Sequence, residues 1–282
     1  MRFEKWQALG NDYLVVDARD LEFDLTPAAV RLLCDRHRGI GSDGVLELLP
    51  PDAEGFVARL RIHNPDGSEA ELSGNGARQA VLYLHRSGWT DSAQFSIQTA
   101  AGEIRPTISS PTVCSLDMGR ARTQSDNYPS GDADGRGTVR AGGRDWAFQH
   151  VAIGNPQCAI RVPDLTALEA LDLPAIGPQI EHSALFPART NISWWTPVGD
   201  GAIRARIFER GVGETLSSGT GACGAAIASV LLGGDSPVRV HLDGGELDVT
   251  VGDDLHVDLA GWAVPVHRGE VSAELLRELA AD

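Results

Sequence analysis

Short apolar runs rich in β-branched and aromatic residues recur along the chain, separated by Gly, Pro, Asp and Asn. Alternation of this kind predicts strands bounded by turns. The pattern predicts strands at residues 13–17, 45–49, 56–63, 95–99, 112–118, 147–153, 158–162, 202–208, 238–242, 247–251 and 255–259. Their close spacing favours antiparallel or mixed sheets over a doubly wound parallel sheet.

Helical periodicity is confined to a few segments. The pattern predicts helices at residues 27–34, 76–87, 165–171, 219–232 and 273–281. Residues 219–232, GTGACGAAIASVLL, carry no charge on any face, which predicts a helix enclosed on all sides at the centre of a lobe. Residues 120–144 are polar and glycine-rich without periodicity, which predicts a surface excursion.

One motif occurs twice, 145 positions apart. Residues 61–77, RIHNPDGSEAELSGNGA, align without a gap with residues 206–222, RIFERGVGETLSSGTGA, and agree at seven of seventeen positions. Chance would give about one match. Leu9-Gly10-Asn11 is answered at nearly the same offset by Ile153-Gly154-Asn155. The repeat predicts two similar lobes with the repeated motifs at the cleft between them.

Composition narrows the classes of function. The 282 residues carry a net charge of −15, which argues against nucleic acid as a partner. The N-terminus lacks a signal-peptide core and no apolar stretch reaches the ~18–20 residues of a membrane span, so we expect a cytoplasmic protein. The four cysteines are scattered without a CxxC pair, which predicts reduced, inert thiols. The histidines show no ligand spacing, so we expect no metal.

Each copy of the motif places a serine before Gly-x-Gly-Ala and a predicted helix. The small residues let a ligand approach the free N–H groups at the helix N-terminus, where a carboxylate or phosphate is favoured. Alternatively, Ser73 and Ser218 are N-caps and the glycines serve tight turns. Duplication favours the first interpretation, because two such termini facing across a cleft could hold one small anion.

Several further motifs make the chain resemble the diaminopimelate epimerase family. They stand in that family's order and spacing over residues 1 to about 270: Leu9-Gly10-Asn11-Asp12-Tyr13, Gly39-Ile40-Gly41-Ser42-Asp43-Gly44, Asn64-Pro65-Asp66-Gly67-Ser68-Glu69, Gly74-Asn75-Gly76-Ala77-Arg78, Gly154-Asn155-Pro156, Arg189-Thr190-Asn191, Glu209-Arg210-Gly211-Val212-Gly213-Glu214-Thr215 and Gly219-Thr220-Gly221-Ala222-Cys223. The resemblance implies an α/β fold of two pseudo-symmetric lobes, residues 1–117 with 264–282 and residues 118–263. Each lobe would be a curved mixed or antiparallel sheet around a central helix, with the active site in the cleft between the lobes.

The resemblance also implies a function and a set of site residues. It implies a cofactor-independent epimerase that acts on diaminopimelate in lysine and peptidoglycan precursor biosynthesis, and a homodimer. The residues that would hold the diamino dicarboxylate are Asn11, Asn64, Gly74, Asn75, Asn155, Asn191, Glu209, Arg210, Gly219 and Thr220. Among them, Arg210 suits a carboxylate and Glu209 suits an ammonium group.

The chain departs from the family at the catalytic positions. The family inverts its α-carbon with two cysteines, and the matching positions here are Ser73 and Ser218, while Gln157 stands where the family has histidine. A serine hydroxyl needs an adjacent base, for which Glu209 and His63 are the candidates. Three explanations stay open: an inactivated variant of an ordinary epimerase, which Gln157 disfavours, a relative with altered chemistry such as a dehydratase or other isomerase, and a catalytically inactive amino-acid-binding protein.

Overall fold

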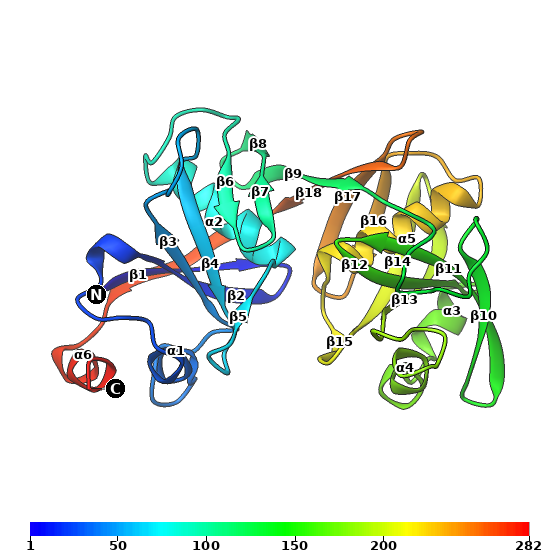
Figure 1. Ribbon diagram of the computed structural model, residues 1–282, viewed down its shortest axis with the longest axis horizontal. Coiled ribbons are helices and arrows are strands. Elements are labelled where there is room, and N and C mark those ends of the chain that lie inside the picture. Colours follow the sequence, from blue (N-terminus) through cyan, green and yellow to red (C-terminus); the bar gives the residue numbers. More distant parts are fainter. Residues whose placement is uncertain (282) are drawn as a thin grey trace. The chain divides into compact units, whose positions relative to one another are not determined.

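The computed structural model describes residues 1–281 and divides the chain into two compact units (Figure 1). Unit 1 comprises Met1–Leu116 and the C-terminal segment from Gly261, and unit 2 comprises Asp117–Ala260. The chain crosses between the units within β9 (Val113–Arg120) and β18 (His256–Trp262).

Unit 1 contains a mixed sheet, three α-helices and the strand β8, which pairs with β9 instead of joining that sheet. Its strands are β1 (Arg2–Ala8), β2 (Asn11–Asp17), β3 (Val45–Leu49), β4 (Ala58–His63), β5 (Glu69–Ala70), β6 (Ile97–Thr99), β7 (Gly102–Ile104), β8 (Pro106–Ser110) and β19 (Val264–Glu270). Its helices are η1 (Ala18–Asp20, a 3₁₀ turn), α1 (Pro27–Cys34), α2 (Gly74–Arg86) and α6 (Ala273–Leu279). Helices α1 and α6 lie side by side and cover one apolar cluster with β2 and β3 (Figure 1).

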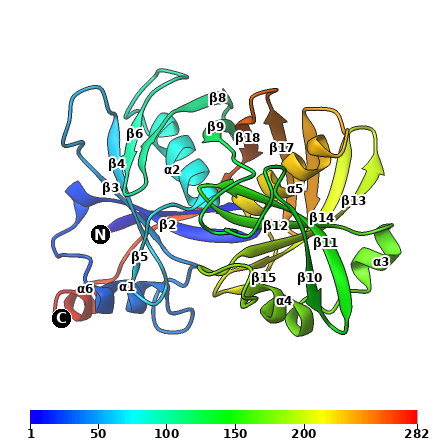
Figure 2. The same ribbon diagram turned by 45° about the vertical axis from the view of Figure 1, so that its right-hand side comes forward.

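Unit 2 has the same kind of architecture. Its strands are β10 (Arg136–Ala141), β11 (Arg144–Ile153), β12 (Asn155–Arg161), β13 (Asn191–Gly199), β14 (Ala202–Glu209), β15 (Gly213–Thr215), β16 (Val238–Leu242) and β17 (Gly245–Val251), followed by β18. Its helices are α3 (Leu165–Glu169), α4 (Leu173–Glu181) and α5 (Gly219–Leu231). Figure 2 shows α5 surrounded by strands of this unit, and it contacts β11 to β14, β16 and β17.

The sequence repeat is also a repeat of topology. In unit 1 the strand order β1-β2-β3-β4-β6-β7 pairs antiparallel, parallel, antiparallel, parallel and antiparallel. In unit 2 the order β11-β12-β13-β14-β16-β17 pairs in the same five senses. The short strands β5 and β15 pair with β4 and β14, and the central helices α2 and α5 follow them. The predicted two-lobed α/β fold with few helices is therefore confirmed.

The enclosed helix α5 matches its uncharged sequence. Gly219 and the run from Gly221 to Ala228 are buried, and the glycines allow strands to come close. A Cβ atom at Gly221 would lie 2.7 Å from Ile207 Cδ1, and one at Gly224 would lie 2.8 Å from Gln157 Cβ. The apolar helix packs on all sides because its small residues leave room for the surrounding sheet.

Several elements were not predicted. The polar segment 120–144 is not a featureless excursion, because it contains β10, whose Val139 and Ala141 are buried while its arginines face solvent. Helix α4 contains Pro174 at its start and Pro178 inside, which hides its periodicity. The prediction also missed β1, β5, β7, β8, β13, β15 and β19. Most of these strands are very short or carry several charges, whereas β8 begins with Pro106 and β13 contains a proline at a register shift.

Candidate functional site

The repeated motif folds into the same strand–turn–helix unit in both copies. In unit 1 the guanidinium of Arg61 pairs with Glu69 at 3.0 Å, and in unit 2 that of Arg206 pairs with Glu214 at 2.5 Å. These four residues occupy matching positions of the repeat. Each ion pair fastens the short strand β5 or β15 against the end of the longer strand that precedes it. The helix that follows is thereby held in the same register in both units.

Ser73 and Ser218 are the N-caps of the two central helices. Ser73 Oγ accepts a hydrogen bond from the Gly76 N–H at 3.1 Å, and Ser218 Oγ accepts one from the Gly221 N–H at 3.2 Å. The cap interpretation is therefore correct for both serines. It does not exclude a chemical role, because each hydroxyl also sits at the positive end of a helix of thirteen residues.

Glu209 is the second partner of Ser218. The Ser218 hydroxyl donates to Glu209 Oε2 at 3.0 Å. Burial raises the pKa of the Glu209 carboxyl, and the hydrogen bond from Ser218 opposes that rise in part. A buried carboxylate with a raised pKa that touches a hydroxyl is a suitable general base. Glu209 is the base that the sequence suggested for this serine, and its carboxyl group bonds the Ser218 hydroxyl.

This buried carboxyl gives a pH-dependent stability prediction. Glu209→Gln is expected to raise the free energy of unfolding near pH 7.5 and to change it little near pH 4. The folded-state pKa lies above the ordinary value of 4.5, so ionisation of Glu209 opposes folding as the pH rises through the raised pKa. Urea unfolding of both proteins at the two pH values checks this. A variant no more stable than the parent at pH 7.5 would contradict it.

Ser73 has different surroundings. Its Oγ accepts a hydrogen bond from the Tyr13 hydroxyl at 3.4 Å, and no carboxylate bonds to it within the described chain. His63, the other candidate base, is buried at the end of β4 with its Nε2 at 3.0 Å from Glu47 Oε2. Its imidazole therefore bonds the Glu47 carboxylate and not Ser73.

The predicted binding residues of unit 1 are arranged around the same helix. The Asn11 side chain donates to Asp43 Oδ2 at 3.0 Å, and Asn75 is buried in the first turn of α2, where Arg78 donates to its Oδ1 at 2.6 Å. Gly74 begins this helix, so its N–H is one of the free donors of the first turn. Asn64 instead donates to Ser68 Oγ at 3.0 Å and so closes its own turn.

The turn that holds Asn64 depends on Gly67. Both Gly67 and Gly55 have positive φ angles, 88° and 87°, but a Cβ at Gly67 would lie 2.5 Å from the Pro27 carbonyl oxygen, whereas Gly55 faces open space. Gly67→Ala is therefore expected to cost about 1–3 kcal/mol more in unfolding free energy than Gly55→Ala. Urea unfolding of the two variants checks this. Equal losses of unfolding free energy would contradict the prediction, because they would show that the turn accommodates a Cβ atom.

In unit 2, hydrogen bonds join Asn191 to Arg210 and Asn155 to Gln157. Asn191 is buried; its Oδ1 accepts from the Arg210 backbone N–H at 2.8 Å, and its amide group donates to the Pro156 carbonyl at 3.3 Å. The exposed Arg210 guanidinium donates to the Ala188 carbonyl at 2.9 Å. Asn155 accepts from the Gln157 amide group. Gly219 and Thr220 form the first turn of α5, where backbone N–H groups lack an acceptor within the helix.

Gln157 is fully buried. Its side-chain nitrogen bonds Asn155, its Cβ packs on Gly224 of α5, and its Oε1 has no hydrogen-bond partner within the described residues. The amide therefore orients the Asn155 side chain. It makes no bond to Ser218, so it does not serve as the base for that hydroxyl.

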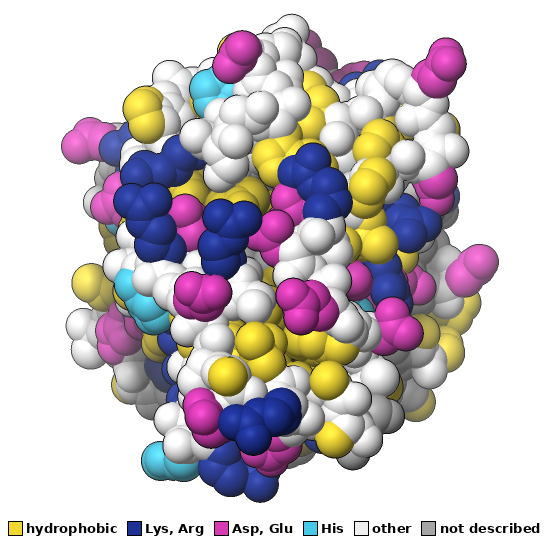
Figure 3. Space-filling model, turned by 90° about the vertical axis from the view of Figure 1, so that its left-hand side faces the viewer, with side chains coloured by type: hydrophobic (Ala, Val, Ile, Leu, Met, Phe, Trp, Pro, Cys, Tyr) yellow, Lys and Arg dark blue, Asp and Glu magenta, His cyan; other side chains and the backbone are white. Residues whose placement is uncertain are grey.

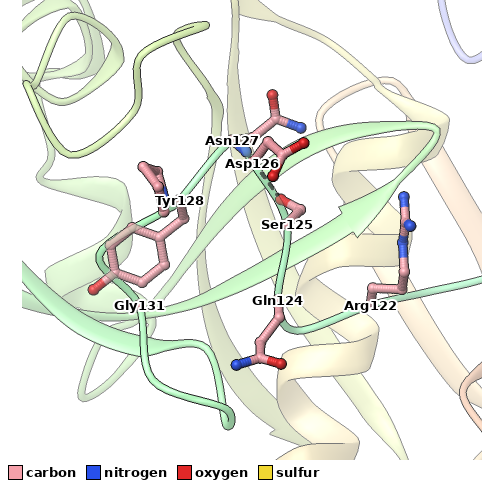
Figure 4. Close-up of a pocket in the computed structure, with 8 residues that line it drawn as sticks. Arg122, Gln124, Ser125, Asp126, Asn127, Tyr128 and Gly131 are labelled. Atoms are coloured by element: carbon pink, nitrogen blue, oxygen red, sulfur yellow. Dashed lines mark hydrogen bonds between the residues drawn. The ribbon is translucent and has the colours of Figure 1, made fainter.

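Other features of the molecule lie outside the repeated motif. A hollow of about 530 Å³ in unit 2 is lined by residues between Arg122 and Gly131, and none of the predicted site residues lines it (Figure 4). Ser125, one of the lining residues, has its Oγ 2.9 Å from Nε2 of the buried His150, and this contact holds the loop against β11. Asp117, His256 and Asp258 bring three ligand-type atoms within 4.8 Å, a grouping that the spacing of the histidines did not predict.

On the face shown in Figure 3, basic side chains are interspersed with acidic and apolar ones. A hollow of about 570 Å³ in unit 1 is lined by residues of β1, β2 and β19 together with Tyr83 and Trp89. All four cysteines are buried and none forms a disulfide within the described residues, and burial raises the pKa of Cys114 to about 12. Among the described residues, no helix is long and apolar enough to cross a membrane.

Comparisons of the sequence point to one family. The family model described as diaminopimelate epimerase matches residues 3–124 and 150–272. A diaminopimelate epimerase of Synechococcus sp. JA-3-3Ab is 39% identical over 278 residues, covering 95% of this chain and 97% of the relative. One of Azoarcus sp. BH72 is 40% identical over 275 residues, covering 96% of this chain and 98% of the relative.

Comparisons of the structure show a shared fold. A "probable proline racemase" from Agrobacterium radiobacter K84 superposes with a TM-score of 0.70 at 15% identity, covering 96% of this chain and 93% of the other. A hydroxyproline epimerase from Agrobacterium vitis superposes with a TM-score of 0.66 at 15% identity, covering 96% and 90%. At these identities the likeness concerns the fold alone.

Proposed function

Because the chain belongs to the diaminopimelate epimerase family, we propose that it is an isomerase that inverts the α-carbon of diaminopimelate, or of a close diamino dicarboxylate, without a cofactor. The observation that carries the proposal is the duplicated cap: a hydroxyl at the N-terminus of each central helix, one of them bonded to a buried carboxylate. We further propose that it works in the cytoplasm, in lysine and peptidoglycan precursor biosynthesis, as a homodimer.

The proposed site draws on both units. Residues 1–117 with 264–282 and residues 118–263 would be its two epimerase lobes, each with one catalytic serine. The substrate's reacting carboxylate would accept from the N–H groups of Gly74-Asn75 and Gly219-Thr220, because helix N-termini favour anions. Arg210 would hold the distal carboxylate, and the asparagine side chains at positions 11, 64, 155 and 191 would bond the ammonium and carboxylate groups.

Two-base chemistry needs one group to remove the α-proton and another to return a proton on the opposite face. Serine is a weak acid and a weak base on its own. Ser218 can act because its proton can pass to the Glu209 carboxylate as its oxygen takes up the α-proton. We propose that this pair takes the part that a thiolate plays in the cysteine members of the family.

The test is incubation of diaminopimelate stereoisomers with the protein in deuterated water, followed by mass spectrometry and chiral separation. If the protein is an epimerase, the inverted product gains one mass unit at its α-carbon. Mass loss would show a dehydratase, and unchanged substrate that nevertheless binds by calorimetry would show an amino-acid-binding protein. Either of these results would end the epimerase proposal.

Thiols are expected to be better catalysts in this scaffold than the native hydroxyls. The Ser73→Cys, Ser218→Cys double variant should exchange the α-proton at least about tenfold faster than the parent, because a thiol with a pKa near ~8.5 ionises far more readily than serine and helix N-termini lower that pKa. Adding Gln157→His should raise the rate further. If the triple variant binds diaminopimelate yet exchanges no deuterium, the pocket does not present the α-carbon to these positions.

A further inference from the structure

The two serine hydroxyls cap their helices in the same way but differ in their second hydrogen bond. Ser73 accepts that bond and Ser218 donates it, a difference that we call opposite polarity. Ser73 Oγ accepts two hydrogen bonds, from the Gly76 N–H and from the Tyr13 hydroxyl. No carboxylate accepts its proton among the described residues. Ser218 Oγ accepts from the Gly221 N–H and donates its proton to Glu209. One oxygen therefore has its lone pairs bonded and a proton to give, and the other has its proton engaged and a lone pair to spare.

This difference arises where the repeat itself breaks. Asn11 and Asn155 begin matching strands, so Tyr13 in β2 occupies the position that Gln157 occupies in β12. Gln157 turns to Asn155 and does not bond Ser218, whereas Tyr13 bonds Ser73. Conversely, Glu209 occupies the position of Asn64, whose amide bonds Ser68. Two exchanged residues thus give two otherwise matching caps opposite polarity.

We propose that Tyr13 is a positioning residue that makes Ser73 the proton donor of the pair, while Ser218 with Glu209 is the proton acceptor. The phenol acts on Ser73 and not on the substrate. Its place is fixed by packing: Tyr13 is 5% exposed, and a Cβ at Gly44 would lie 2.6 Å from its ring carbon Cε1. The use of this polarity on an α-carbon rests on the proposed function, whereas the polarity itself does not.

The proton transfers balance without any further reactant. The α-C–H bond breaks and its electron pair stays on carbon, while Ser218 Oγ takes the proton and passes its own to the Glu209 carboxylate. The Ser73 O–H bond breaks and its proton forms the new C–H bond on the opposite face. The Ser73 oxyanion is stabilised by the Tyr13 O–H and the Gly76 N–H until water returns a proton to it and Glu209 gives one up.

Thiols placed at the two cap positions should differ in acidity, whether or not the protein is catalytically active. A thiolate at position 73 would accept two hydrogen bonds, whereas one at position 218 would face a carboxylate, and hydrogen bonds to the charged form lower a pKa while a like charge raises it. Ser73→Cys should therefore carry the more acidic thiol. Removing the Tyr13 hydroxyl should raise the pKa of that thiol by about one unit, since one unit corresponds to the loss of about one hydrogen bond.

The test measures the rate of iodoacetamide alkylation against pH in the single variants Ser73→Cys and Ser218→Cys, each with and without Tyr13→Phe. Buried native cysteines give the background in the parent protein. Near neutral pH, Tyr13→Phe should slow alkylation at position 73 about tenfold and leave position 218 unchanged. Tyr83→Phe, in the same unit, is the matched control and should change neither. A thiol at 218 as acidic as that at 73, or one at 73 indifferent to Tyr13, would overturn the proposal.

A second measurement separates this inference from the proposed function. With diaminopimelate in deuterated water, Tyr13→Phe should raise the ratio of deuterium exchange with retention to exchange with inversion, because proton removal at Ser218 persists while delivery from Ser73 slows. A folding defect would lower both rates together. If the parent exchanges nothing, the proposed function fails, and the thiol measurement still decides the polarity.

Discussion

Arg210→Ala is expected to weaken binding of diaminopimelate by about 100-fold or more. In the free protein the guanidinium donates to the Ala188 carbonyl and forms no ion pair among the described residues, while Asn191 fixes its backbone. It is therefore free to accept a carboxylate. Removing one partner of a hydrogen-bonded charge pair costs about 2–5 kcal/mol, because the other charge is left unpaired. Calorimetric titration of both proteins measures the change.

Arg239→Ala is the matched control for this prediction. Arg239 lies in the same unit, and its exposed guanidinium pairs with Asp248 on the sheet surface. Its loss should leave affinity within about twofold, since exposed ion pairs contribute little. Equal affinity in the Arg210 variant and the parent would place the distal carboxylate elsewhere. No binding by the parent would mean that the pocket takes a different substrate.

Glu209→Gln is expected to lower α-proton exchange by about 10²–10⁴-fold, the usual contribution of a positioned general base. The amide keeps the size of the side chain but cannot take the Ser218 proton. Because the same change is expected to stabilise the folded protein at neutral pH, lost activity cannot be attributed to unfolding. Deuterium incorporation measures the rate, and Glu246→Gln, exposed on β17, is the control.

An active Glu209→Gln variant would contradict the assigned base. The substrate's own groups or water would then have to remove the Ser218 proton. Unchanged binding with lost exchange would instead support the account, because it separates the proton-transfer step from recognition.

The repeat made the fold predictable. Two copies of an Arg–Glu pair and of a Ser-Gly-x-Gly-Ala turn in the sequence predicted two similar units. The matching strand order of the two units follows from that duplication. The uncharged run in α5 also predicted a central helix. These features were predicted correctly because they depend on local periodicity and on glycine positions, both of which are visible in the sequence.

Other elements could not be predicted because tertiary packing determines them. Strand β1 carries Arg2, Glu4 and Lys5, and it is a strand because β2 and β19 pair with it on both sides. Helix α4 forms in spite of its prolines because Leu173 and Ile180 are buried in the core of unit 2. In both β1 and α4, tertiary contacts stabilise an element that the local sequence pattern does not favour.

For the candidate site, the sequence supplied residue types but not hydrogen-bond partners. Glu209 was named from its closeness to the repeated motif, and the bond to Ser218 agrees. His63 was named because it stands next to Asn64, yet it pairs with Glu47, which is 16 residues away in the chain and lies on the neighbouring strand β3. Tyr13 had no signal beyond its motif, because its contact with Ser73 joins segments sixty residues apart.

We propose that Ser73 and Ser218 act on the same α-carbon. A crystal structure with meso-diaminopimelate bound tests it most directly. The account predicts both Oγ atoms within about 3–3.5 Å of one α-carbon, on opposite faces, with the Ser218 hydroxyl still bonded to Glu209 and Ser73 still bonded to Tyr13. An α-carbon that lies beyond the reach of either hydroxyl would contradict it.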